Sequence, residues 1–168
     1  MKKVVAAAAM CLAFGASHAA IDIYTAGLLG SNEVGVGDPD GYGGATVMID
    51  NLTNTVTWSL FTLAVDPLTL AHIHKGAAGV NGPVIIDFNA MPFGTLVDAD
   101  AAMINPGNAM GFYVNLHTAA FPGGAVRGQL MWSKTINPPI PEPSTYALML
   151  GGLAGVMLLA RRRKLSVE

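Results

Sequence analysis

The fold is decided by residues 43–60, which read GGATVMIDNLTNTVTWSL. In the second half of this stretch, Val56, Trp58 and Leu60 alternate with hydroxyl-bearing side chains. That period of two predicts a strand with one buried face. The first half predicts a partner strand, and residues 51–54 between them (Asn-Leu-Thr-Asn) are typical of a hairpin turn. Antiparallel β structure is therefore expected at the centre of the chain.

Outward from this hairpin, short apolar segments alternate with clusters of Gly, Pro, Asn and Asp. Five further strands are predicted, at residues 21–29, 68–74, 83–88, 110–117 and 125–132. Long loops are predicted at 31–41 and 89–107, and the alternation slips at Phe61, which predicts a β-bulge. Seven short strands separated by turn-forming residues predict an antiparallel β-sandwich or barrel over residues 20–137.

Charge is unevenly distributed along the chain. The 168 residues carry a net charge of −2, with 52% hydrophobic and 12% charged residues. Between Ala20 and Ile140, however, there are nine acidic residues and only three basic ones, Lys75, Arg127 and Lys134, which gives a net charge of −6. Binding to a phosphate backbone needs clustered Lys and Arg, so this distribution excludes nucleic acid as a main partner.

Residues 1–19 predict a secretory signal peptide. Two lysines precede an apolar run, and small residues occupy the −3 and −1 positions before the bond between Ala19 and Ala20. We expect signal peptidase to cut that bond; a retained N-terminal anchor is the alternative. Cys11, the only cysteine, lies in this segment, so the exported domain would contain no disulfide.

The C-terminal end has three ordered parts: a Pro-rich spacer at 138–143, an apolar run at 144–160 and a basic tail at 161–168. The apolar run predicts a single transmembrane helix, and the basic tail predicts a cytoplasmic C-terminus. This arrangement resembles a PEP-CTERM sorting signal. The residues that carry the resemblance, besides the helix, are Pro141, Glu142, Pro143, Arg161, Arg162 and Arg163.

The PEP-CTERM resemblance implies a Gram-negative bacterial protein that is held briefly in the inner membrane. It further implies cleavage near the Pro-Glu-Pro triplet by an exosortase-type membrane protease. The product would reach the cell surface or the exopolysaccharide matrix. A permanent single-pass anchor is the alternative.

Three histidines are candidates for a metal site. His72 and His74 lie two apart on a predicted strand, so both side chains point to one face, and His117 closes another predicted strand. Imidazole suits copper, zinc or nickel, but histidines that hydrogen-bond loop backbone are the alternative. Arg127 is expected beside them, as a clamp for a carboxylate, a guide for an anionic ligand, or a structural residue.

The same region resembles a CHRD domain from about residue 21 to residue 132. The resemblance is carried by segments 28–33, 44–47, 71–76, 82–84, 115–118, 121–124 and 127–130, with Gly79. It implies an immunoglobulin-like β-sandwich of poorly defined biochemical activity.

A fainter similarity links His72, His74, His117 and Arg127 to copper/zinc superoxide dismutase, which is a Greek-key β-barrel. That similarity implies a copper site. However, no bridging histidine or zinc-ligand cluster lies between Gly76 and Met110, and the disulfide cysteines are absent.

Templates for other enzymes are missing: the sequence has no Gly-x-Ser-x-Gly elbow and no P-loop, and the predicted exported domain has no cysteine. We therefore predict a non-catalytic surface or extracellular-matrix protein that contributes to envelope or exopolysaccharide organisation or to adhesion. Its expected partners, besides the two proteases, are exopolysaccharide or surface proteins. The alternative is a copper-binding, superoxide-dismutase-like oxidoreductase that uses His72, His74 and His117.

Overall fold

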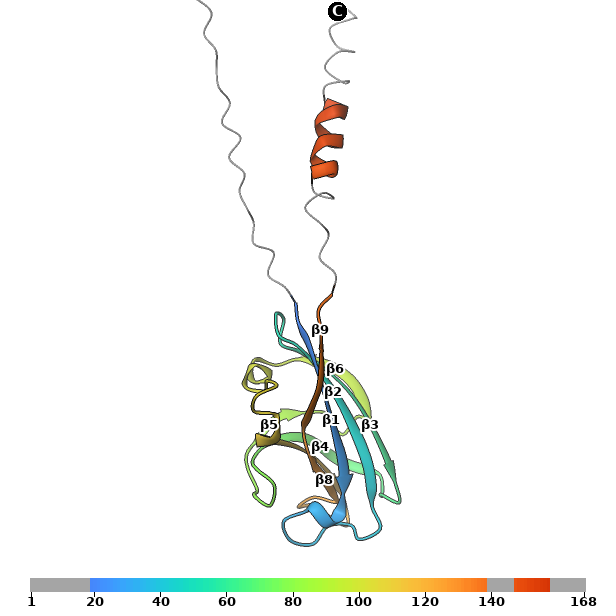
Figure 1. Cartoon of the computed structure of the whole chain (residues 1–168). Coiled ribbons are helices and arrows are strands. Elements are labelled where there is room, and N and C mark those ends of the chain that lie inside the picture. Colours follow the sequence, from blue (N-terminus) through green and yellow to red (C-terminus); the bar gives the residue numbers. More distant parts are fainter. Residues whose placement is uncertain (1–18, 139–146, 158–168) are drawn as a thin grey trace, which may run out of the picture. The chain divides into compact units, whose positions relative to one another are not determined.

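Nine antiparallel strands dominate the chain between residues 19 and 138 (Figure 1). The structure is a computed structural model, and it describes residues 19–138 and 147–157. The strands are β1 (Ile21–Leu29), β2 (Tyr42–Asp50), β3 (Thr55–Leu63), β4 (Leu68–Lys75), β5 (Val84–Asp87), β6 (Phe93–Val97), β7 (Phe112–Thr118), β8 (Val126–Gln129) and β9 (Met131–Ile136). Three short 3-10 helices connect them: η1 (Gly30–Asn32), η2 (Ala99–Met103) and η3 (Ala109–Gly111).

The strands form one sheet in the order β5-β4-β7-β8-β1-β2-β3-β6, and β9 pairs with β1 along the edge that β8 also uses. This sheet curls over a shared core. Trp58 of β3 stacks on Phe88, directly after β5, with ring centroids 4.6 Å apart, although β3 and β5 lie near opposite ends of the strand order. The prediction of an all-β antiparallel domain is confirmed.

The central hairpin forms as predicted, but the predicted bulge does not. β2 and β3 pair without a register shift from Tyr42 opposite Leu63 to Asp50 opposite Thr55. Alternation continues through Phe61, which is 61% exposed and packs on Gly44, its cross-strand partner. The prediction was wrong because an exposed aromatic ring that covers a glycine looks, in sequence, like a shifted core residue.

Other predicted boundaries need correction. The expected loop at 89–107 contains β6, whose Gly94 lies opposite Trp58, where a side chain would collide with the indole ring. The predicted strand at 125–132 is two strands separated by Leu130. The strand expected at 110–117 begins at Phe112, because η3 occupies its first two residues.

Residues 147–157 form a separate helix. No helix within the two described ranges is long and apolar enough to cross a membrane. Residues 1–18, 139–146 and 158–168 lie outside the described parts. The predicted signal peptide, most of the spacer, the sorting residues Pro141 to Pro143, the ends of the predicted membrane helix and the basic tail all fall there.

Candidate metal centre

Polar side chains are buried together on one face of the adjacent strands β4, β7 and β8. Register places His72 opposite Asn115 and Asn115 opposite Arg127, while His74 lies opposite Tyr113. The set, which we call the outer polar layer, consists of His72, His74, Tyr113, Asn115, His117 and Arg127, none more than 9% exposed. The intervening residues of β4 and β7, such as Ile73 and Leu116, point the other way into the core.

The three histidines meet within this layer. Because β4 and β7 are neighbours, His117 lies opposite Leu70, two residues before His72 on β4. One ring nitrogen from each histidine can be chosen such that all three lie within 4.8 Å of one another. His72 Nδ1 and His117 Nε2 are 3.3 Å apart, close to the roughly 3.3 Å that separates two nitrogens bound tetrahedrally to one ion.

Backbone carbonyls determine which nitrogen of two rings is free. His74 Nδ1 lies 2.9 Å from the Gly82 oxygen, and His117 Nδ1 lies 3.0 Å from the Pro122 oxygen. A carbonyl only accepts, so each Nδ1 carries the hydrogen and each Nε2 keeps its lone pair. His117 Nε2 then accepts from His72 Nδ1, whereas the buried Nε2 of His74 has no hydrogen-bond partner.

The third ring has an acidic neighbour. His72 Nε2 lies 3.7 Å from Asp87 Oδ1, and Asp87 is its cross-strand partner on β5. If His72 binds a metal through Nδ1, the proton on Nδ1 must leave, and Nε2 can carry a proton beside this carboxylate. The arrangement therefore supports a ligand set of His72 Nδ1, His74 Nε2 and His117 Nε2.

The electrostatic environment keeps these rings neutral. Burial lowers the pKa of each of the three histidines. For His72, the neighbouring His117 lowers the pKa further, and Asp87 opposes the effect. A neutral imidazole has the lone pair that a metal requires, so the site is prepared for a cation near neutral pH.

Arg127 is hydrogen-bonded to the loop at residues 76–83, between β4 and β5. It donates from Nη1 to Asn81 Oδ1 at 2.9 Å and from Nη2 to the Val80 oxygen at 3.2 Å. Its guanidinium lies 4.2 Å from the ring centre of Tyr113, which in turn stacks on His74 at 5.0 Å. Within the described residues, no carboxylate lies within ion-pair distance of Arg127. These contacts favour the structural interpretation of Arg127 over the carboxylate clamp.

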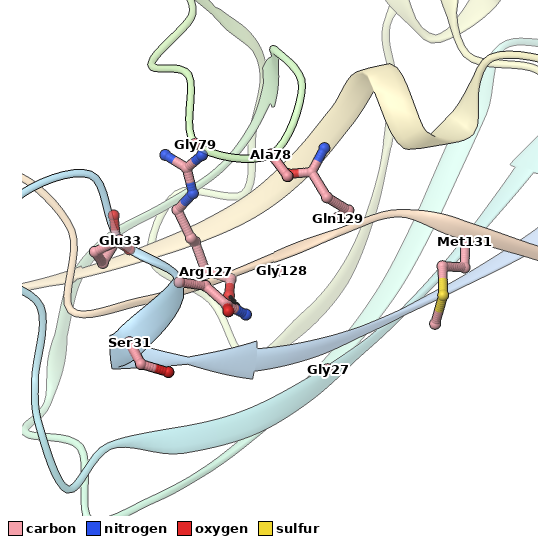
Figure 2. Close-up of a pocket in the computed structure, with 10 residues that line it drawn as sticks. Gly27, Ser31, Glu33, Ala78, Gly79, Arg127, Gly128, Gln129 and Met131 are labelled. Carbon is pink, nitrogen blue, oxygen red and sulfur yellow. Dashed lines mark hydrogen bonds between the residues drawn. The ribbon is translucent and has the colours of Figure 1, made fainter.

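Beside Arg127 lies an open pocket, which Glu33, Gly79 and Gln129 help to line (Figure 2). Figure 2 shows the Arg127 side chain extending from β8 toward the loop that carries Gly79. Burial raises the pKa of Glu33 to about 7, while Arg127 acts to lower it. None of the three histidines lines this pocket, so it is separate from the candidate metal centre.

Sequence reasoning identified the three histidines and Arg127, and the structure brings all four into the outer polar layer. It missed Tyr113, Asn115 and Asp87. A signal for two of them is present, because Tyr113, Asn115 and His117 alternate with Phe112, Val114 and Leu116 along β7. Asp87 gave no local signal, since its pairing with His72 depends on strand order.

Two family models match this chain, one over the strand domain and one C-terminal to it. A family model for the CHRD domain matches residues 24–130, and one for the PEP-CTERM protein-sorting motif matches residues 139–164. No curated protein and no solved structure matches the chain significantly. The sorting motif implies export, membrane-associated sorting and exosortase-type processing before surface display. Because the first match spans most of the chain, this protein belongs to the CHRD domain family.

Proposed function

We propose that this protein is a non-catalytic surface or matrix protein whose CHRD domain binds one transition-metal ion through His72, His74 and His117. The observation that carries the proposal is the convergence of three buried imidazole nitrogens within 4.8 Å, one of them without a partner. Buried polar atoms almost always have partners, so an unpaired ligand atom in a three-histidine cluster favours a bound ion.

Copper is the metal we favour. An all-imidazole set suits copper or zinc, and a given nitrogen site generally binds Cu²⁺ more tightly than Zn²⁺. The ion would connect β4 with β7, and the carbonyls of Gly82 and Pro122 would hold the ligand rings in orientation. In a domain without cysteines, such a link replaces the stabilisation that disulfides give to other exported proteins.

We propose an immunoglobulin-like, Greek-key sandwich for the curled sheet, signal-peptide cleavage between Ala19 and Ala20, and a membrane helix at 144–160 that is lost after exosortase-type cleavage. At the surface, the domain would contribute to envelope or exopolysaccharide organisation or to adhesion. Intact-mass measurement of surface material tests the processing: retention of Arg161 to Lys164 would leave only a permanent anchor.

Metal binding is tested by titrating the purified full chain, in detergent, with Cu²⁺ and with Zn²⁺. We expect one Cu²⁺ per chain and a higher melting temperature when it is bound. His74→Gln should lose at least tenfold in affinity, because it removes the unpartnered nitrogen. Tyr113→Phe is the matched control, since it removes the hydroxyl that accepts from the Gly82 N–H but keeps the stacked ring. Equal affinity of His74→Gln and the unmodified chain would contradict the proposal.

A second candidate is a copper-dependent oxidoreductase of the superoxide dismutase type. It is favoured by the same observation, because three histidine ligands leave a coordination position open for a small substrate. A superoxide assay on the copper-loaded chain separates the two functions. Turnover that depends on His74 would replace the non-catalytic interpretation.

A further inference from the structure

Asn115 lies among the candidate ligands and its side-chain oxygen has no hydrogen-bond partner. The residue is 3% exposed and lies directly opposite His72 on β4 and Arg127 on β8. His117 is two residues further along β7 and therefore on the same face. Burying an unpaired amide oxygen costs free energy, so this position needs an explanation.

The unpaired Nε2 of His74 belongs to the same layer. His74 is the diagonal neighbour of Asn115, because His72 pairs with Asn115 and His74 pairs with Tyr113. Both unpaired atoms are acceptors, but different partners suit them. A neutral imidazole nitrogen can bind a metal ion, and an amide oxygen can accept a hydrogen bond from an O–H group. A metal ion that carries a water molecule supplies both partners at once.

We propose that Asn115 is a positioning residue that accepts a hydrogen bond from a water bound as the fourth ligand of the ion held by the three histidines. The inference rests on the proposed metal site and adds its fourth coordination position. Three protein ligands with water in the fourth position form an open site, where a small anion can displace the water. Asn115 would thus weaken anion binding by stabilising the water that competes with it.

A purely structural role for Asn115 makes different predictions. If its oxygen accepted from a water held by the protein alone, the bond would exist with and without metal. Substitution would then change the stability of both forms equally. In our proposal the oxygen gains its partner only when the metal is present.

The test uses Asn115→Leu in the full chain, with and without one equivalent of Cu²⁺. Leucine has a similar volume and removes the orphaned oxygen. We expect the melting temperature of the metal-free form to rise, and the increase caused by copper to become smaller than in the unmodified chain. Azide, followed by its charge-transfer absorbance with copper, should bind roughly fivefold more tightly, the ratio that corresponds to one lost hydrogen bond of about 1 kcal/mol.

Thr118→Val is the matched control, because Thr118 lies on the same strand, is fully buried and faces away from the layer. Its hydroxyl accepts from the Phe121 N–H, so its loss should lower the stability of both forms and leave azide affinity unchanged. Should Asn115→Leu not fold, Asn115→Asp serves instead: it keeps an acceptor and adds negative charge, so azide should bind at least tenfold more weakly.

The outcomes separate the two proposals. An unmodified chain that binds no copper overturns both the metal site and this inference. A chain that binds copper, but whose Asn115 variant shows unchanged azide affinity and equal stability changes in both forms, overturns only the role of Asn115.

Discussion

Acidification of the metal-free protein should reduce its stability steeply below pH 6.5. His72, His74 and His117 have pKa values lowered from the ordinary 6.5, with burial as the first cause. A lowered histidine pKa means that the unfolded chain binds protons more readily than the folded one. Their contribution to stability is therefore complete above pH 6.5 and is lost as the pH falls below it.

Glu33 acts in the opposite direction over part of this range. Its pKa is raised from 4.5 to about 7, so the folded chain holds a proton that the unfolded chain releases. This contribution to stability is present below pH 4.5 and is lost as the pH rises toward 7. Near pH 5.5, Glu33 therefore offsets roughly one of the protons that the histidines take up on unfolding.

The expected slope follows from the net number of protons. The three histidines take up at most three protons on unfolding, and Glu33 releases about one, so the net uptake near pH 5.5 is at most about two. Each proton taken up contributes roughly 1.4 kcal/mol per pH unit, so the free energy of unfolding should fall as the pH decreases, by at most about 3 kcal/mol per unit near pH 5.5. Glu33→Gln should steepen this slope because the opposing proton release is lost, and His72→Gln should make it shallower, each by at most about 1 kcal/mol per pH unit.

Urea unfolding of the chelator-treated full chain measures this slope. The pH values of the series, 7.0, 6.5, 6.0 and 5.5, lie around and below the ordinary histidine pKa of roughly 6.5. The two variants distinguish the histidines from other titrating groups. A free energy of unfolding that stays constant or rises as the pH falls would refute the reasoning. It would show that the folded histidines accept protons as readily as the unfolded ones.

Three further changes test particular contacts. Gly94→Ala would place a carbon 2.5 Å from the Trp58 ring, so it should cost about 1–3 kcal/mol of stability and change Trp58 fluorescence; a neutral result would show that the indole moves freely. Arg127→Lys loses the planar stack on Tyr113 and the two hydrogen bonds to the loop at residues 76–83, and should cost roughly 2 kcal/mol in urea unfolding; an unchanged midpoint would contradict the structural role. Asp87→Asn should weaken Cu²⁺ binding roughly tenfold with little change in metal-free stability, and equal affinity would show that this carboxylate does not orient the histidine that it faces.

The sequence predicted those parts of the fold that depend on local pattern. Period-two alternation located β3, and the Asn-rich turn joined it to β2 as expected. β6 was missed because Gly94 and the neighbouring Pro92 look like loop residues in the sequence, which does not show that Gly94 packs against the indole of Trp58. In general, a glycine that makes room for a distant aromatic ring cannot be recognised from its neighbours along the chain.

The candidate site, too, could be predicted from the sequence only where it depends on local pattern. Strand parity alone predicted that His72 and His74 share a face. Whether His117 joins them depends on β4 lying next to β7, and the two strands are separated in sequence by β5, β6, η2 and η3. That neighbour relation comes from long-range pairing, which no local pattern records. The loop contacts that set the histidine tautomers, from Gly82 and Pro122, depend on it in turn.

Metal binding and acid sensitivity are linked through the same three side chains. Binding at a free copper concentration a hundred times the dissociation constant would add about 2.7 kcal/mol to the free energy of unfolding. That binding requires neutral imidazoles, so protonation weakens it as the pH falls below the range in which the metal-free fold is most stable. Acid therefore has two effects over the same pH range: it removes the ion, and it destabilises the metal-free protein that remains. The loss of structure with pH should be steeper for the copper-loaded chain than for the metal-free chain, although the copper-loaded chain starts from higher stability at pH values above roughly 6.5.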